Sequence, residues 1–330
     1  MINIEEMMGG LEIGQPHVFN NISMFPLLRA KANESEYIML DEALNAGTVE
    51  ITEISEDGSV PNLMFLNKGD IPVLLLDGEE LVGAKQNRVL NLSILAPANA
   101  TTSIPVSCVE AGRWAYNSPN FKSASRTMFS RGRASKSEHV SKFMRVDGNR
   151  RSDQGAIWDD IAAKSERMSV DSETGAMSDI FENFEEKLDE YVNGFDACEN
   201  QIGAIFSIDG SIMGVDLFDK PDTLEKTLKK LVRSYALDAM ETADPKDEQA
   251  SHDKAERFLE NIKKCRFDSF PAVGLGQDLR IDSRSISGGA LVDDGRMIHL
   301  WAFPLRSERP SQFGRMGSHL TRSSRRQRMH

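Results

Sequence analysis

The chain has 330 residues and carries a formal net charge of −12, with a sequence pI of about 5.1. This acidic balance argues against a dedicated duplex-DNA-binding protein, which needs a broad basic face to neutralise phosphates. The composition of 40% hydrophobic and 27% charged residues is typical of a globular protein with a substantial core, in one large domain or two ordinary ones.

The first third of the chain is predicted to be rich in strands. Residues 37–47 have the pattern of a short helix that ends at Gly47. The apolar and alternating segments that follow predict strands, with short turns between them, over 49–55, 62–67, 73–78, 88–95 and 101–110.

Residues 118–151 differ in character from the strands before them. They contain nine Lys and Arg residues, against only Glu138 and Asp147. The hydrophobic periodicity is faint, so we predict a loop or mobile excursion with some helix near 136–145. Such a basic segment could close over a phosphate-bearing ligand, contact single-stranded RNA or dock a protein partner. Docking on the chain's own acidic helices, such as 182–190, is an equal alternative.

The remainder of the chain alternates between helices and strands. The patterns predict helices over 152–168, with Ser152 as the N-cap, over 177–195, over 224–240 after Pro221, and over 254–265. A strand pair is predicted over 203–218, and further strands run from residue 266 to about residue 304. We expect the tail 305–330 to be disordered, because residues 306–330 hold seven Arg and one Glu, and its MGSH segment resembles a vector-derived sequence.

The dipeptide Asp-Gly recurs between apolar strands at 77–78, 209–210 and 294–295. Asp-Gly tolerates the positive φ of tight hairpin turns. The repeated pattern indicates either an internal duplication or only the common preference of hairpins for this pair. Together the patterns predict an α+β fold, with an antiparallel β-rich core of Asp-Gly hairpins and inserted amphipathic helices. We expect a single domain over 12–304, with β sub-units 12–115 and 196–304 as one interpretation, joined by the excursion 118–151 and the helices 152–195.

The stretch LLLDGEELVGAKQNRVLN (74–91) places many polar residues directly after an apolar strand. We predict a hairpin that turns at Asp77–Gly78. Its return strand would carry four consecutive polar residues, Lys85, Gln86, Asn87 and Arg88. Successive side chains of a strand face opposite sides, so two of the four would point into whatever packs there. Buried cations need carboxylate partners or an anionic ligand. An exposed, ion-paired hairpin is the alternative.

The same stretch also carries a family resemblance. It is followed by IPVSCVEAGRW (104–114), and both segments resemble the ADP-ribosylglycohydrolase and rhodanese-phosphatase-superfamily-associated protein domain. Further similar segments are SDQGAIWDDI (152–161), TGAMSDIF (174–181), QIGAIFSIDGSIMGVDLFD (201–219) and SGGALVDDGRMIHLWAFP (287–304). The resemblance covers residues from about 12 to 304. It implies, by association with ADP-ribose-processing enzymes, a role near NAD or ADP-ribose metabolism, and it assigns no catalytic residues.

Three other places hold residues suited to a binding site. CVEAGRW supplies Glu110, Arg113 and Trp114 at a strand end, where Arg can hold a phosphate and Trp can stack on a base. An internal Glu110–Arg113 pair with Trp114 in the core is the alternative. Asp278 and Arg280 share one face of a strand and form either an ion pair or a ligand clamp. His299, inside an apolar strand, is either a structural His or a general base.

The cysteines and the N-terminus bound the cellular setting. Cys108, Cys198 and Cys265 show no C-x-x-C or Cys/His metal spacing, so we predict free thiols and no metal site. The acidic N-terminus does not resemble a signal peptide, and the apolar runs are too short to span a membrane. We therefore expect a soluble cytoplasmic protein that acts neither on membranes nor on duplex DNA.

These features favour a protein that binds, and as one option processes, a phosphorylated nucleotide related to ADP-ribose or NAD. Phosphate would lie on residues 85–88 and Arg113, while Glu79, Glu80 or His299 would act on the ligand. The alternative is a non-enzymatic protein-interaction module with a structural hairpin. A metal-dependent hydrolase that uses Glu79, Glu80 and His299 is weaker, because one histidine and two adjacent carboxylates make a poor ligand set. Whether the protein is an enzyme stays open, and no cofactor is assigned.

Overall fold

The structure is a computed structural model that describes residues 2–30, 36–54, 61–113, 120–242 and 250–305. These residues form eight helices and 18 strands in three sheets, which confirms the predicted α+β class. Among the described helices, none combines the length and the apolar composition needed to cross a membrane.

The largest sheet has nine strands and joins the two ends of the described chain. Its order is β1-β3-β13-β14-β18-β17-β16-β15, with β2 paired to β3, and all its pairs are antiparallel. The strands are β1 Glu12–Ile13, β2 His17–Phe19, β3 Ile22–Leu28, β13 Gln201–Ile208, β14 Ser211–Phe218, β15 Arg266–Pro271, β16 Gln277–Asp282, β17 Ile286–Asp293 and β18 Arg296–Pro304.

Two smaller sheets come from residues 38–127. The six-stranded sheet has the order β12-β8-β9-β11-β6-β5, and the three-stranded sheet has the order β10-β7-β4 with a parallel β4–β7 pair. Their strands are β4 Ile38–Met39, β5 Val49–Glu53, β6 Asn62–Asn67, β7 Val73–Leu75, β8 Glu79–Gly83, β9 Arg88–Leu90, β10 Ile94–Ala96, β11 Ala100–Cys108 and β12 Phe121–Thr127.

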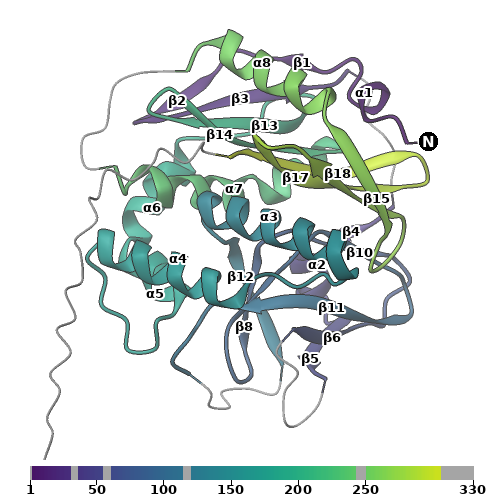
Figure 1. The fold of residues 1–330 in the computed structure, drawn as a ribbon, viewed down its shortest axis with the longest axis vertical. Coiled ribbons are helices and arrows are strands. Elements are labelled where there is room, and N and C mark those ends of the chain that lie inside the picture. The colour runs from purple at the N-terminus through teal and green to yellow at the C-terminus, as the bar shows by residue number, and fades with distance from the viewer. Residues whose placement is uncertain (1, 31–35, 55–60, 114–119, 243–249, 306–330) are drawn as a thin grey trace, which may run out of the picture.

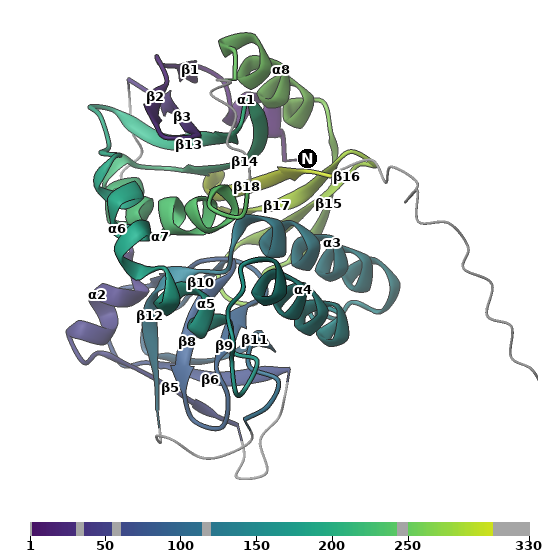
Figure 2. The ribbon, with the colours of Figure 1, turned by 90° about the vertical axis from the view of Figure 1, so that its left-hand side faces the viewer.

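Helices separate the two large sheets and cover the outer face of the upper one (Figures 1 and 2). Helices α3 and α7 lie between the sheets, and α8 lies on the outer face of the nine-stranded sheet (Figure 1). One hydrophobic core fills the space between the sheets and a second lies under α8. The helices are α1 Ile4–Met7, α2 Leu40–Asn45, α3 Ser130–Asp147, α4 Gln154–Arg167, α5 Met177–Asn183, α6 Glu185–Asn193, α7 Pro221–Ala239 and α8 His252–Lys263.

The basic segment 118–151 is not mainly the loop that we predicted, although the helix predicted near 136–145 does lie inside α3. Its described part consists of strand β12 and the 18-residue helix α3. The buried face of α3 carries Arg133, Lys136 and Ser137 beside Val140 and Met144, at helical spacing. Because half of this face is polar, the apolar period that identifies a helix is missing from the sequence.

The hairpin predicted at Asp77–Gly78 is also wrong. This turn connects β7 of the three-stranded sheet to β8 of the six-stranded sheet. Strand β8 ends at Gly83 and β9 begins at Arg88, so the polar residues 84–87 form the turn and not the return strand. Asp209–Gly210 and Asp294–Gly295 do close hairpins, with positive φ at both residues of each pair.

Two predicted helix features also differ from the structure. The helix predicted over 177–195 is broken at Phe184 into α5 and α6. The N-cap of α4 is Asp153 and not Ser152, because the Asp153 carboxylate accepts a hydrogen bond from the backbone N–H of Ala156 at 3.1 Å.

We propose that residues 12–304 form a single domain. The hydrophobic core between the two large sheets draws side chains from both of them and from α7, which supports this organisation. Strands β1 to β3, from residues 12–28, pair with the C-terminal strands and not with residues 38–127. This pairing favours the single domain over two β sub-units bounded at residues 115 and 196. The tail 306–330 and Trp114 lie outside the described residues.

Candidate functional site

A network of buried charges joins α3 to both large sheets. The guanidinium of Arg133 donates hydrogen bonds to Asp216 at 2.6 and 3.2 Å and to Asp77 at 3.3 Å. The ammonium of Lys136 contacts the other carboxylate oxygen of Asp77. All four side chains are fully buried. The Asp77 carboxylate, in the turn after β7, thus pairs with two cations of α3. The network connects this turn to Asp216 of β14.

His299 of β18 connects this network to Ser93. The Nδ1 atom of His299 lies 2.7 Å from Oγ of Ser93, and its Nε2 atom lies 3.3 Å from Asp216. The ring stacks between Phe218 and Trp301. The series has the residue types of a serine-hydrolase triad. However, Ser93 is 1% exposed and lines neither of the pockets that form the groove described below, so the geometry supports a buried structural histidine.

The environment shifts the pKa values of this network in opposite directions. Burial lowers the pKa of Lys136 to about 8, against the attraction of Asp77. Burial also lowers the pKa of His299, so its ring is neutral near pH 7. Burial alone would raise the pKa of Asp216, but Arg133 and His299 outweigh it and hold that pKa well below its ordinary value. The Asp216 carboxylate therefore stays ionised.

Two adjoining pockets form a groove beside this network. Their volumes are about 360 and 460 Å³, and both are lined by Pro61 and Arg151. One wall comes from β6 and β11, and the other comes from residues 148–155, where α3 passes into α4. The tip of the β15–β16 hairpin contributes Ala272 and Val273 at one end. We call this feature the α3–α4 groove.

The α3–α4 groove contains polar groups suited to an anion. The Arg151 guanidinium lies 3.9 Å from the ring centroid of Phe143 and ion-pairs with Asp147 at 3.3 Å. Arg150 donates to the carbonyl of Pro271. Ser152 is 8% exposed, and its Oγ has no hydrogen-bond partner among the described residues. Guanidinium and hydroxyl groups next to a helix N-terminus are typical of phosphate sites.

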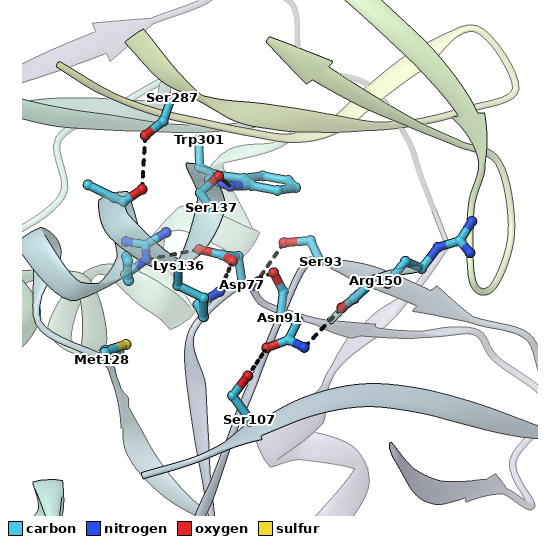
Figure 3. A network of polar contacts seen from close by, with 12 residues as sticks. Asp77, Asn91, Ser93, Ser107, Met128, Lys136, Ser137, Arg150, Ser287 and Trp301 are labelled. Carbon is cyan, nitrogen blue, oxygen red and sulfur yellow. Dashed lines mark hydrogen bonds and ion pairs between the residues drawn. The ribbon is translucent and has the colours of Figure 1, made fainter. Parts of the chain in front are cut away.

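Asn91 links the α3–α4 groove to the buried charges (Figure 3). Its side-chain amide donates to the carbonyl of Arg150 at 2.9 Å and accepts from Oγ of Ser107 at 2.7 Å. Its backbone carbonyl accepts from Lys136 at 3.1 Å. The lining residues Arg150 and Ser107 are thus connected to the Lys136–Asp77 pair through Asn91.

The predicted residues of the 84–88 turn and of CVEAGRW do come together, but they bond one another. Arg113 donates to Glu110 at 2.9 Å, to Asn87 at 3.1 Å and to the carbonyl of Ala84 at 3.0 Å. Burial would raise the pKa of Glu110, but the hydrogen bonds from Arg113 and Asn87 outweigh it and lower that pKa. This is the internal alternative, in which Arg113 pairs with Glu110.

Arg88 is fully buried at the start of β9. It donates to Gln86 at 2.9 Å and to Sγ of Cys108 at 2.8 Å, and it lies 3.6 Å from Glu53. Lys85 is half-buried in the turn. The ion pair with Glu53 and the two hydrogen bonds offset the buried charge of Arg88 without a ligand at the turn, while its Nε and Nη2 atoms have no hydrogen-bond partner among the described residues.

Glu79 and Glu80 are fully buried on opposite faces of β8. Glu79 pairs with Lys230 of α7, and Glu80 lies 2.5 Å from Arg126 of β12. Burial raises both pKa values in spite of these cations. His299 belongs to the other large sheet, so the three residues do not form the metal-ligand set weighed above. In the described part of the chain, no group of three His, Cys, Asp or Glu residues has metal-site geometry.

Asp278 and Arg280 share a face of β16, as we predicted, and form a buried ion pair at 2.9 Å. The Arg280 guanidinium also lies 5.2 Å from the ring centroid of Trp301. Neither residue lines the α3–α4 groove. Asp278 and Arg280 belong to the nine-stranded sheet, whereas Arg113 follows β11 of the six-stranded sheet.

Comparison with known proteins identifies the family. The family model of the ARG and rhodanese-phosphatase-superfamily-associated protein domain matches residues 10–303. The chain belongs to this family. Searches of the curated proteins and of the solved structures returned no significant match for this family member.

Sequence patterns did not identify the residues that connect the α3–α4 groove to the buried charges. The sequence predicts Asp77 as a turn residue and Ser152 as an N-cap, and Asn91 and Ser107 lie inside the family-resembling segments without a role of their own. One signal was available. A helix drawn through 130–147 places Arg133, Lys136 and Ser137 on one face with Val140 and Met144, and such a face must meet buried carboxylates.

Proposed function

We propose that this protein binds a phosphorylated nucleotide related to ADP-ribose or NAD in the α3–α4 groove. The observation that carries the proposal is the buried Oγ of Ser152. This hydroxyl has no hydrogen-bond partner among the described residues and lies between the groove-lining Arg151 and the N-terminus of α4. An unsatisfied buried hydroxyl next to a guanidinium suits a phosphate oxygen.

The size and shape of the groove support this ligand class. Pockets for small molecules and cofactors have volumes of about 300 to 1,000 Å³, and the two adjoining pockets of 360 and 460 Å³ fall in that range. Phe143 contacts one face of the Arg151 guanidinium, and the Arg151 side chain is 51% exposed. Bases stack on guanidinium planes, so a nucleobase fits beside Arg151 while the phosphates lie near Ser152.

The family association supports the choice of nucleotide. As part of this proposal, we take ARG in the family name to stand for ADP-ribosylglycohydrolase. This meaning links the family to ADP-ribose-processing enzymes. The proposal moves phosphate binding from residues 85–88 and Arg113 to residues 150–152. We propose that the groove binds the nucleotide and do not propose a reaction there, because Glu79, Glu80 and His299 are fully buried and do not line the groove.

Calorimetric titration with ADP-ribose, NAD and nicotinamide mononucleotide tests the proposal. Arg151→Ala should raise the Kd of the bound nucleotide at least about tenfold, since a charge-assisted hydrogen bond is worth about 1.5 kcal/mol or more. Arg167→Ala is the matched control, because both arginine side chains are 51% exposed and Arg167 lies at the far end of α4. Absence of binding heat with all three nucleotides, using well-folded protein, would refute the proposal.

A non-enzymatic protein-interaction module is the second candidate. Two observations favour it: Arg88 and Arg113 each pair with a carboxylate of the chain itself, Glu53 and Glu110, and Val146 of α3 is 75% exposed. On this candidate the wild-type protein gives no heat with any of the three nucleotides, whereas Arg88→Ala should lower the melting temperature strongly on either candidate, because Arg88 is fully buried. Nucleotide binding that Arg151→Ala weakens would instead favour the first candidate.

A further inference from the structure

We infer that Asn91 is the positioning residue of the α3–α4 groove, a role that rests on the function proposed above. Asn91 is fully buried and does not line the groove itself. Instead it holds two residues that do, Ser107 and Arg150. These two residues belong to opposite walls, so a single side chain fixes the distance between the walls.

The geometry uses both ends of the Asn91 amide. Nδ2 donates to the carbonyl of Arg150 at 2.9 Å, and Oδ1 accepts from Oγ of Ser107 at 2.7 Å. Ser107 lies in β11, and Arg150 lies in the connection after α3. The hydrogen bond to the Arg150 carbonyl fixes the peptide plane between Arg150 and Arg151. It thereby fixes the backbone from which the Arg151 and Ser152 side chains, proposed to contact phosphate, extend.

The backbone of Asn91 is anchored as firmly as its side chain. Its carbonyl accepts from Nζ of Lys136 at 3.1 Å, and its N–H donates to the carbonyl of Pro105 at 3.1 Å. Lys136 is itself held by Asp77 in the interior (Figure 3). The amide therefore keeps a fixed place relative to α3, from whose end the 148–153 connection leaves.

The chemistry of the residue explains why asparagine suits this position. The site needs one donor and one acceptor at fixed places, which an amide supplies and a carboxylate does not. Asn91→Asp replaces the Nδ2 donor with an oxygen that faces the Arg150 carbonyl. An amide group does not exchange protons readily, so the Ser107–Asn91–Lys136 series positions groups and does not carry protons.

The test compares Asn91→Asp and Ser107→Ala with the matched control Asn67→Asp. Asn67 is 1% exposed, its Nδ2 donates to the carbonyls of Ile71 and Pro97, and its Oδ1 accepts from the N–H of Gly69. Asn67 lies at the opposite end of β6 from Asn62, the β6 residue that lines the groove. Both Asp variants remove the same donor from a buried amide.

Amide hydrogen exchange of unliganded protein and titration with ADP-ribose are the two measurements. We expect Asn91→Asp and Ser107→Ala to speed exchange over 148–153 by about tenfold and to raise the Kd for ADP-ribose by about tenfold, equivalent to about 1.4 kcal/mol. Asn67→Asp should change neither quantity, although it lowers the melting temperature.

The two measurements separate the two proposals. If wild-type protein binds none of ADP-ribose, NAD and nicotinamide mononucleotide, the proposed function fails, and the exchange data alone decide the role of Asn91. Exchange over 148–153 that is unchanged in both variants, or equally fast in Asn67→Asp, overturns the positioning role. If Asn91→Asp does not fold, Ser107→Ala decides, because it removes only one hydroxyl from the β11 wall.

Discussion

Arg133 keeps its charge in the protein interior because two carboxylates surround it. Burial opposes this charge, but Asp216 and Asp77 outweigh burial and raise the pKa of Arg133 above its ordinary value. Its hydrocarbon stem also packs beside Gly78, and its guanidinium lies 5.0 Å from the ring centroid of Phe303. The price of burying these ions is high, so each partner has a large effect on stability.

Removal of Asp216 should therefore be strongly destabilising. Asp216→Ala leaves the buried Arg133 with Asp77 as its remaining carboxylate partner, and we expect a loss of about 3–5 kcal/mol in unfolding free energy by urea denaturation. Asp294→Asn at an 85% exposed turn residue serves as the control and should change that energy by less than about 0.5 kcal/mol. A cost for Asp216→Ala no larger than that of the control contradicts the role of the pair.

His299 gives the stability a pH dependence with a defined sign. Burial lowers its folded-state pKa from the ordinary 6.5, so the unfolded chain binds more protons as the pH falls through that value. Stability from His299 is present above 6.5 and is lost on acidification. When the pH is lowered from about 7.5 to 5.5, the unfolding free energy measured by urea denaturation should fall more for wild type than for His299→Gln. Equal losses in the two proteins would show that folding leaves the pKa of His299 unchanged, which would contradict this prediction.

At the residue scale, the sequence predicted partners correctly only where they were near in the chain. The pairs Glu110–Arg113 and Asp278–Arg280 were each raised as one of two alternatives and are seen. The partners of Asp77, Arg133 and Lys230 come from strands and helices more than 50 positions away. A single sequence contains no local pattern that specifies such distances, so these contacts could not be predicted.

At the element scale, helix α3 shows why hydrophobic periodicity did not predict the whole helix. An apolar stripe at helical spacing predicts a helix, but the buried face of α3 includes Arg133, Lys136, Ser137 and Ser141. Strand β3 was missed for a related reason, because it carries Pro26 inside a fully paired strand. Strands β5, β6, β11, β13 and β14 followed their alternation or their continuous apolar runs and were predicted within about two residues.

Two glycines at positive φ allow a test of how α3 packs. Gly78 has φ of +78° and Gly295 has φ of +72°, so alanine costs about 1 kcal/mol at either position. A Cβ at Gly78 would lie 2.9 Å from Cγ of Arg133, whereas nothing lies within 4 Å at Gly295. We expect Gly78→Ala to lose about 1–3 kcal/mol more than Gly295→Ala in urea denaturation. Equal losses would mean that the Arg133 side chain shifts at little cost in free energy.

At the scale of the whole molecule, the order of the strands sets the position of the groove. The chain starts in the nine-stranded sheet, builds the two smaller sheets, and returns to complete the first one. The return brings the β15–β16 hairpin tip against the three-stranded sheet, where the N–H of Leu275 donates to the carbonyl of Leu95 at 2.8 Å. The α3–α4 groove lies where these parts meet, and local sequence patterns do not reveal such a junction.

The central claim is that a nucleotide binds in the α3–α4 groove and not at the 84–88 turn. A crystal structure of the protein with ADP-ribose at saturating concentration tests it most directly. We predict that the pyrophosphate contacts Arg151 and Ser152, with the Asn91 amide still bonded to Ser107 and Arg150. ADP-ribose bound against Arg88 and Arg113, or a groove that stays empty in well-diffracting crystals, would contradict the account.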